Sequence, residues 1–332
     1  MRDLQRRLSA LGHESGADEP GRFEEPTERA VRAFQEARGL RVDGVCGRQT
    51  WSALVEAGWG LGDRLLYHRS PPLRGDDVAV LQRRLGALGF DAGRVDGILG
   101  VRTAAALAEF QRNAGLTSDA ICGPATLAAL ERLGPRGSGA SVASVREREA
   151  LRHAARTLTG KRVAVGAGPG LDALVTAVGR ALTEAGAVVA TLTDLDDSIL
   201  ALQANAFGAE AYLGLAGAEH GCAAAYYATR GFESTGGRHL AALLQAAVAP
   251  VLTDQPCPAR GMTLPVLRET RMPAVVCELG PPGAVVERTA DLAQALAGAV
   301  QAWVEAPVEV EVQSPQRKSQ AVDSARETAR PH

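Results

Sequence analysis

The sequence predicts a multidomain protein in which two all-α, three-helix modules precede an α/β domain with a mostly parallel sheet. Three observations lead to this prediction: an internal repeat near the N-terminus, a Gly/Ser-rich stretch after its second copy, and an alternation of strand-like and helix-like segments from Lys161 onward. With 332 residues, of which 46% are hydrophobic, the chain is long enough for several compact units.

The repeat is clearest in two leucine-rich stretches. Residues 4–12 are LQRRLSALG and residues 81–89 are LQRRLGALG. The match resumes at the Phe-Gln pairs 34–35 and 110–111 and ends in Thr-x-x-Ala-Leu at 50–54 and 126–130. Such self-similarity indicates a repeat architecture. We assign repeat 1 to residues 1–58 and repeat 2 to residues 72–134, and repeat 1 is short at its N-terminus.

Each copy is predicted to form three short helices. Leu4, Leu8 and Leu11 are spaced i, i+4, i+7, which places them on one face of the first helix. Asp-Gly-x-x-Gly turns, one with alanine replacing a glycine, precede later helices, although repeat 1 has no such turn before its second helix. The residues expected to open the second and third helices as N-caps are Thr27, Thr50, Thr103 and Thr126.

The second half of the chain changes pattern. Residues 135–147 have the composition of a flexible linker, residues 148–306 form the α/β domain, and the polar residues 307–332 are expected to be a disordered tail. Strands are predicted near 163–165, 188–192, 211–215 and 274–279, with helices near 171–185, 199–207, 237–248 and 291–304. This alternation predicts a mostly parallel sheet covered on both faces.

Composition and charge exclude several classes of function. Lys and Arg number 36 against 38 Asp and Glu, a formal net charge of −2, so no footprint for nucleic acid is expected. No apolar run approaches the roughly 20 residues that cross a bilayer, so no membrane span is expected. The N-terminus has no apolar signal segment, and the five scattered cysteines are typical of a reducing compartment. We expect a cytoplasmic protein, or an extracellular one if the true start lies upstream of Met1.

The two copies resemble the bacterial peptidoglycan-binding repeat. Repeat 2 has every element of that pattern, with Ala120 in place of one turn glycine. The resemblance implies that peptidoglycan or its precursors bind a shallow groove through the turns. The alternative is that the same residues only form turns and cap helices. The ligand-binding residues that the resemblance implies are Asp43, Gly44, Gly47, Thr50, Asp96, Gly97, Gly100, Thr103, Asp119, Gly123 and Thr126.

The α/β domain resembles the zinc-dependent N-acetylmuramoyl-L-alanine amidases over about residues 160–305. Residues 266–280, VLRETRMPAVVCELG, are similar to that family's last motif, and the resemblance implies Glu278 as the catalytic acid/base. The family's two zinc-binding histidines correspond to Pro169 and Ala216, whose side chains cannot bind a metal. The segment with the family's zinc-binding glutamate looks deleted before Leu171. We therefore expect no cofactor, a retained Glu278 with no metal-bound water to activate, and a domain that does not catalyse the reaction.

Two alternatives stay open at this stage. An active amidase would need zinc held by displaced ligands, for which His220 is the first candidate; the others are His239, Cys222, Cys257 and Cys277. A nucleotide-binding domain would use the glycine-rich turn 166–170 with Asp194 and Asp196. The turn has the spacing G-x-G-x-G, and its proline removes an N–H that could bind phosphate.

A more specific resemblance is to the CwlM type of actinobacterial amidase-like proteins. It is carried by residues 61–68, LGDRLLYH, and by residues 270–273, TRMP. Proteins of this type have two such repeats, no signal peptide and a degraded zinc site. The resemblance implies that the protein regulates cell-wall synthesis, with a cell-wall synthesis enzyme and a Ser/Thr kinase as further partners.

Overall fold

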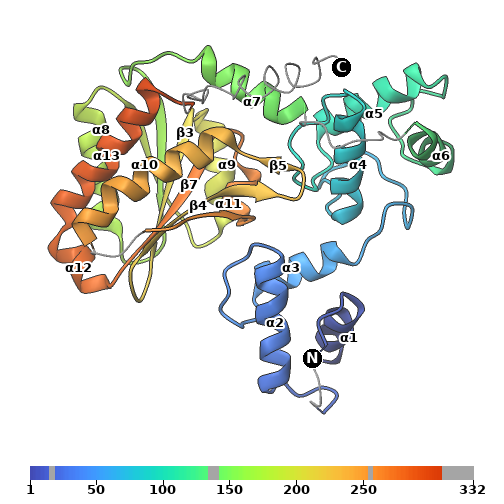
Figure 1. Ribbon diagram of the computed structural model, residues 1–332, viewed down its shortest axis with the longest axis horizontal. Coiled ribbons are helices and arrows are strands. Elements are labelled where there is room, and N and C mark those ends of the chain that lie inside the picture. Colours follow the sequence, from blue (N-terminus) through green and yellow to red (C-terminus); the bar gives the residue numbers. More distant parts are fainter. Residues whose placement is uncertain (15–18, 134–141, 253–256, 309–332) are drawn as a thin grey trace, which may run out of the picture.

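The computed structural model describes residues 1–14, 19–133, 142–252 and 257–308. The part of the predicted linker at 135–141, and the predicted tail from residue 309 onward, lie outside the described residues. The described chain forms two helical repeats and one α/β domain, and both repeats lie on the side of the sheet away from α8 (Asp172–Glu184) and α13 (Thr289–Glu305) (Figure 1).

The two repeats have the same order of helices. Repeat 1 contains α1 (Arg2–Ala10), α2 (Glu25–Ala37) and α3 (Arg48–Ala57). Repeat 2 contains α4 (Asp76–Ala87), α5 (Val101–Asn113) and α6 (Pro124–Arg132). Each repeat has its own small apolar core, which includes Phe34 in repeat 1 and Phe110 in repeat 2.

The threonines predicted as N-caps are not at that position. The residues that cap α2, α3, α5 and α6 are Glu24, Gly47, Gly100 and Gly123. The threonines lie inside the first turn of each helix and are buried. The prediction of threonine N-caps is therefore wrong. Each threonine hydroxyl instead accepts a hydrogen bond from a glutamine side chain.

The sheet of the α/β domain has the order β2-β1-β3-β7-β4-β5, and β6 pairs with β4. The four strands that the sequence predicted are parallel to one another: β1 (Arg162–Ala167), β2 (Val188–Thr193), β3 (Ala211–Gly217) and β7 (Ala274–Leu279). Three further strands, which the sequence did not indicate, make the sheet mixed. β4 (Cys222–Thr229) is antiparallel to β7, β5 (Phe232–Glu233) is antiparallel to β4, and β6 (Ala259–Met262) is parallel to β4. The prediction of a mostly parallel sheet is thus correct only for this four-strand part.

Helices cover both faces of the sheet. One core contains side chains of α8, α13 and α10 (Thr235–Leu252). The core on the other face contains α9 (Asp197–Phe207) and α11 (Pro265–Glu269), and it also includes Val95 from repeat 2. A further short helix, α12 (Pro282–Glu287), precedes α13.

The second part of the predicted linker is a helix. α7 spans Val142–Arg152, and its Ala143 and Leu151 are buried in the two cores of the α/β domain. Glu147 accepts a 2.6 Å hydrogen bond from the hydroxyl of Ser234 and a second from the amide of Thr235. The boundary between the linker and the α/β domain therefore lies before residue 148.

Cys222 and Cys257 form a disulfide that joins the start of β4 to the segment before β6. The spacing of the cysteines did not predict this pair, because only the fold brings the two residues together. None of the helices in the described ranges combines the length and the apolar character that a membrane crossing needs.

Candidate functional site

A buried glutamine side chain holds each turn of the repeats in place through hydrogen bonds to the turn backbone. In repeat 2, the carbonyl oxygen of Gln82 accepts hydrogen bonds from the amides of Asp96 (3.0 Å) and Gly97 (2.8 Å). Its amide nitrogen donates to the Asp96 carboxylate (2.8 Å), the Ile98 carbonyl (3.1 Å) and the Thr103 hydroxyl (3.2 Å). Gln82 is buried, so this one side chain satisfies a buried turn that would otherwise lack partners.

The same arrangement occurs three more times. Gln35 and Gln111 bind their turns and threonines in the same way; the partners are Asp43, Gly44, Val45 and Thr50 for Gln35, and Asp119, Ala120, Ile121 and Thr126 for Gln111. Gln5 accepts from the Gly21 amide and donates to the Arg22 carbonyl and to Thr27. This fourth turn was not predicted, because its sequence lacks the Asp-Gly signature. The available signal was the Leu-Gln pair that it shares with the other copy.

These hydrogen bonds limit which of the predicted ligand-binding residues remain available to a ligand. The hydroxyls of Thr50, Thr103 and Thr126 bond to glutamines, and the residues are at most 4% exposed. Gly44 and Gly97 have φ of 75° and 68°, the left-handed region that favours glycine. The glycines thus form the turns and the threonine hydroxyls bond to the glutamines that hold these turns, whereas a ligand-binding role stays a prediction. The helix caps Gly47 and Gly100 have open space beside them, so ligand access is greatest there.

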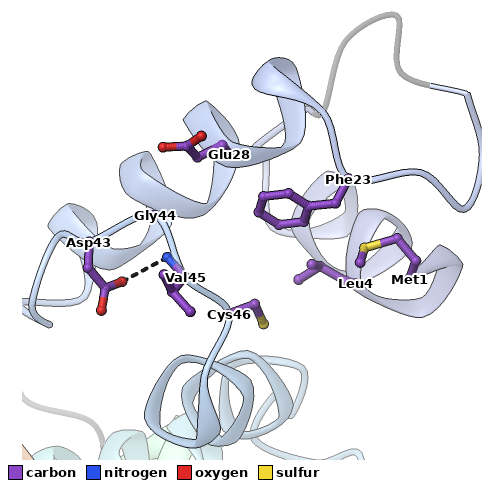
Figure 2. A pocket seen from close by; sticks show the side chains of 8 residues that line it. All are labelled: Met1, Leu4, Phe23, Glu28, Asp43, Gly44, Val45 and Cys46. Carbon is purple, nitrogen blue, oxygen red and sulfur yellow. Dashed lines mark hydrogen bonds between the residues drawn. The ribbon is translucent and has the colours of Figure 1, made fainter.

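Repeat 1 has a pocket of about 400 Å³ between its first helix and the turn that Asp43 begins (Figure 2). The residues that line it are Met1, Leu4, Phe23, Glu28, Asp43, Gly44, Val45 and Cys46. The Asp43 carboxylate accepts a 2.8 Å hydrogen bond from the Val45 amide, which holds the turn at the pocket edge. Two predicted ligand-binding residues, Asp43 and Gly44, therefore line an open surface pocket.

A second candidate site lies at the carboxyl ends of the parallel strands. Pro169 follows β1, Ala216 lies near the end of β3, and Glu278 lies near the end of β7. Ala216 and Glu278 are direct partners in the β3–β7 register. The Gly168 amide donates a 3.0 Å bond to the Leu215 carbonyl, which brings the turn containing Pro169 beside β3. In parallel α/β sheets this edge is where ligands bind.

Repeat 1 contacts this edge. Its Arg41 lies 3.4 Å from a carboxylate oxygen of Glu278, whose side chain is 23% exposed. The same loop also contacts the segment after β6, at the opposite end of β4. There the Thr263 amide donates a 2.8 Å hydrogen bond to the Gly39 carbonyl, and the Thr263 hydroxyl donates to the Arg38 carbonyl. The loop between α2 and α3 thus reaches the predicted catalytic acid/base from another part of the chain, which the sequence did not indicate.

Acidic residues at the start of α9 extend this contact. Arg48 of repeat 1 forms a 2.5 Å ion pair with Asp196, and Gln49 donates a 3.1 Å hydrogen bond to Asp197. Burial raises the pKa of Asp197, and the nearby positive charge of Arg41 opposes that increase. Repeat 1 therefore contacts the rim of the site through three basic or polar side chains, and not through one isolated pair.

Comparisons with known proteins identify the family of the chain. Residues 1–54 and 74–130 match a family model described as a putative peptidoglycan binding domain. Over 290 residues, the chain is 39% identical to N-acetylmuramoyl-L-alanine amidase CwlM of Mycobacterium tuberculosis (strain ATCC 25618 / H37Rv), covering 78% of this chain and 71% of the relative. The chain belongs to the CwlM-like family of peptidoglycan-binding, amidase-like proteins.

Further relatives match a smaller share of the chain. N-acetylmuramoyl-L-alanine amidase CwlL of Bacillus licheniformis is 35% identical over 156 residues, which are 40% of this chain and 43% of the relative. The crystal structure of the amidase Ami1 from Mycobacterium smegmatis aligns with a TM-score of 0.38 and 14% identity, over 45% of this chain and 98% of that chain.

The two residues that the sequence resemblance predicts at the zinc positions of the amidases do not fit a zinc ion. Pro169 and Ala216 have no side-chain donor atom, and a proline nitrogen has no lone pair to offer within a peptide bond. Only four residues separate β1 from α8, which leaves no room for a further ligand-bearing segment there. Among the residues that the structure describes, no three His, Cys, Asp or Glu side chains gather as a metal site.

Among the described residues, the displaced candidates do not gather in a group of three either. His220 is exposed in the loop between β3 and β4, and Cys222 and Cys257 meet only as a disulfide. Cys277 is buried, and burial together with the charge of Glu278 raises the pKa of its thiol to about 12, so it stays protonated at neutral pH. His239 contacts the Ala306 carbonyl at 2.8 Å on another helix.

The geometry does not favour the nucleotide alternative. A side-chain atom on Gly166 would lie 2.2 Å from the hydroxyl of the buried Tyr212, so this glycine faces packed protein and not an open phosphate site. The Asp196 carboxylate accepts from the Ser198 amide as the N-cap of α9 and pairs with Arg48. Asp194 accepts from the Asp196 amide. Both acids therefore have structural partners.

Proposed function

We propose that this protein binds peptidoglycan or its precursors and regulates cell-wall synthesis, and that its amidase-like domain does not hydrolyse the muramoyl–L-alanine amide bond. The observation that carries the proposal is the Arg41–Glu278 contact at an edge where Pro169 and Ala216 replace metal ligands. A guanidinium group of the protein itself faces the retained glutamate.

The chemistry of amide hydrolysis explains why this arrangement is unfavourable for catalysis. A carboxylate acts as general base only on a water held within hydrogen-bond reach and in the right place for attack. In a metal-dependent hydrolase the metal lowers the pKa of that water. Here no side chain at the two family positions can hold a metal, and the Arg41 guanidinium lies 3.4 Å from a carboxylate oxygen of Glu278, where an attacking water would have to be held.

Regulation is supported by the family relationship and by the arrangement of the domains. The binding repeats contact the amidase-like site directly, so a ligand on the repeats can alter the exposure of that edge. We further propose a cell-wall synthesis enzyme and a Ser/Thr kinase as partners, and a cytoplasmic location, on the basis of the resemblance to the CwlM type.

Metal analysis and a cleavage assay test the proposal together. Full-length protein, purified without chelator and with zinc added, is expected to contain far less than one equivalent of zinc and to release no peptide from muropeptides. Stoichiometric zinc, together with cleavage that Glu278→Gln abolishes, would show an active amidase. A pelleting assay tests the claim that the protein binds peptidoglycan. The protein is expected to pellet with peptidoglycan sacculi but not with cellulose, and equal recovery with both polymers would count against the claim.

A further inference from the structure

The first helix of each repeat carries two consecutive arginines, and the repeats differ in how these arginines are paired. Residues 3–8, DLQRRL, align with residues 80–85, VLQRRL. In repeat 1 one oxygen of the Asp3 carboxylate pairs with Arg6, and the other accepts a 2.9 Å hydrogen bond from Nε of Arg7. These contacts, chiefly the hydrogen bond from Arg7, lower the pKa of Asp3. One carboxylate therefore binds two guanidinium groups.

Repeat 2 keeps the two arginines and lacks the carboxylate. The residue that corresponds to Asp3 is Val80, and the arginine pair is Arg83 and Arg84. Within the described ranges, neither arginine forms a hydrogen bond or an ion pair. The Nη1 atom of Arg84 is buried without a partner, although the side chain as a whole is partly exposed. The two positive charges of this helix are therefore not balanced as they are in repeat 1.

The surroundings of Arg83 add positive charge. Its aliphatic part lies against Gly231 in the turn between β4 and β5, where an added Cβ would be 2.7 Å from Cδ of the arginine (Figure 1). Burial lowers the pKa of Arg83, Asp76 raises it, and the charge of Arg230 lowers it further. The Asp76 carboxylate is already bound by Arg38 of repeat 1, whose Nη2 lies 2.8 Å from both oxygens. A partly desolvated cation beside a second cation gains more from an anion than a fully solvated cation does.

We propose that repeat 2 has a carboxylate-binding site formed by Arg83 and Arg84. The ligand carboxylate lies over Val80, in the place that the Asp3 carboxylate takes in repeat 1. Positions i, i+3 and i+4 are neighbours on a helix surface, so both guanidinium groups reach a group above Val80. The fork of donors on a guanidinium matches the geometry of a carboxylate.

This site assigns different roles to the two repeats. The arginines of repeat 1 are occupied by their own aspartate, so the carboxylate site belongs to repeat 2. It lies on the first helix of the repeat and contains none of the turn and threonine residues that the sequence resemblance implied. The inference rests on the proposed function for the source of the carboxylate, which is the peptide part of peptidoglycan.

Nuclear magnetic resonance of the protein tests the site directly. N-acetylalanine, whose only charge is a carboxylate, should shift the Nε resonance of Arg84 with a dissociation constant of about 1–10 mM, as for a very small ligand. The Nε resonance of Arg7 should not move, and the uncharged N-acetylalaninamide should shift neither. An Arg84 resonance that does not respond to N-acetylalanine overturns the proposal. Inorganic phosphate that binds more tightly than N-acetylalanine overturns the assignment to a carboxylate.

Val80→Asp tests the same site without removing an arginine. The new carboxylate pairs with the arginines, as Asp3 does in repeat 1, and it repels the ligand, so N-acetylalanine should bind at least about threefold more weakly. Val80→Asn has nearly the same size without the charge and is the matched control, which should bind as tightly as the wild type. Equal binding by both variants counts against the site.

Pelleting with peptidoglycan sacculi tests the source of the carboxylate. Arg84→Gln should lower recovery at least about threefold, and sacculi whose carboxylates have been amidated should give a similar loss with the wild type. Arg7→Gln, the matched change in repeat 1, should have little effect. A wild type that pellets equally with native and amidated sacculi contradicts the carboxylate site alone. A wild type that binds N-acetylalanine but does not pellet contradicts the proposed function, and with it peptidoglycan as the source.

Discussion

Arg268 holds both repeats against the α/β domain, and its removal gives the sharpest test of the observed arrangement. One guanidinium nitrogen lies 2.8 Å from a carboxylate oxygen of Glu56 in repeat 1, and the two side chains are 17% and 15% exposed. Another nitrogen donates to the Asp96 carbonyl in repeat 2. Arg268→Ala breaks both contacts and leaves Glu56 half-buried without this partner.

The expected cost follows from that burial. Removing one partner of a buried, hydrogen-bonded charge pair costs several kcal/mol, because the remaining charge stays desolvated. Since both side chains keep some exposure, we expect the docking of repeat 1 to weaken by about 2–4 kcal/mol. At about 1.4 kcal/mol for each factor of ten, this corresponds to a change of roughly 30- to 900-fold in the docking equilibrium.

Hydrogen exchange measures that equilibrium at one amide. Thr263 donates to the Gly39 carbonyl across the interface, so its amide exchanges when repeat 1 undocks. Arg268→Ala should speed this exchange by the factor above. Arg268→Lys should have a smaller effect, because lysine keeps the charge but not the planar fork of donors.

The control is Arg180→Ala, which removes an exposed arginine that faces Glu184 at 3.8 Å on the same helix. It should leave Thr263 exchange unchanged, because exposed pairs contribute little. If Arg268→Ala also leaves Thr263 exchange unchanged, Arg268 does not hold the repeats in place, and the contact between Arg41 and Glu278 needs another explanation.

Three further predictions concern repeat 2 and its contact with the sheet. Gln82→Ala removes five hydrogen bonds from a buried turn. In a denaturant titration it should lower the free energy of unfolding of repeat 2 by about 3–5 kcal/mol, and a loss below about 1 kcal/mol would show that water replaces the glutamine. Burial raises the pKa of Asp96, so its contribution to stability is present at low pH and is lost as the pH rises through the folded-state pKa. Asp96→Asn keeps the acceptor oxygen and should flatten this pH dependence in thermal melts between pH 3 and 7. An unchanged slope of melting temperature against pH would exclude Asp96 as its source. Tyr227→Phe removes a 2.9 Å hydrogen bond to the Val95 carbonyl and should cost about 0.5–1.5 kcal/mol, because Thr229 still donates to that carbonyl; calorimetry that shows a gain in stability would contradict this role.

The repeat architecture was predictable because its determinants are local. Leu4 and Leu8 lie one helical turn apart, so their spacing alone indicates a buried helix face, and both are buried. The match between the two copies fixed the position of every helix relative to the turns. The role of the threonines was misjudged because an N-cap and a residue three positions further into the helix have similar sequence surroundings, and only the position of Gln35 or Gln82 separates them.

The α/β domain was predictable in its parallel part only. Strands such as β1 and β3 are continuous apolar runs, because helices cover them on both faces. β4 and β6 are harder to detect, since β6 is short and largely exposed and β4 follows β3 after only four residues. Their pairing depends on contacts with β7 and not on their own periodicity.

The sequence by itself determined that two homologous helical repeats precede an amidase-like domain, and its resemblance to the zinc-dependent amidases predicts that Pro169 and Ala216 stand where that family has metal ligands. It did so because side-chain chemistry and short-range spacing are properties of the chain. Only the tertiary structure decided that Arg41 of repeat 1 faces Glu278 and that Val95 of repeat 2 is buried against the sheet. Both features join segments that are distant in sequence, and such contacts depend on how complete domains pack, which no local pattern records.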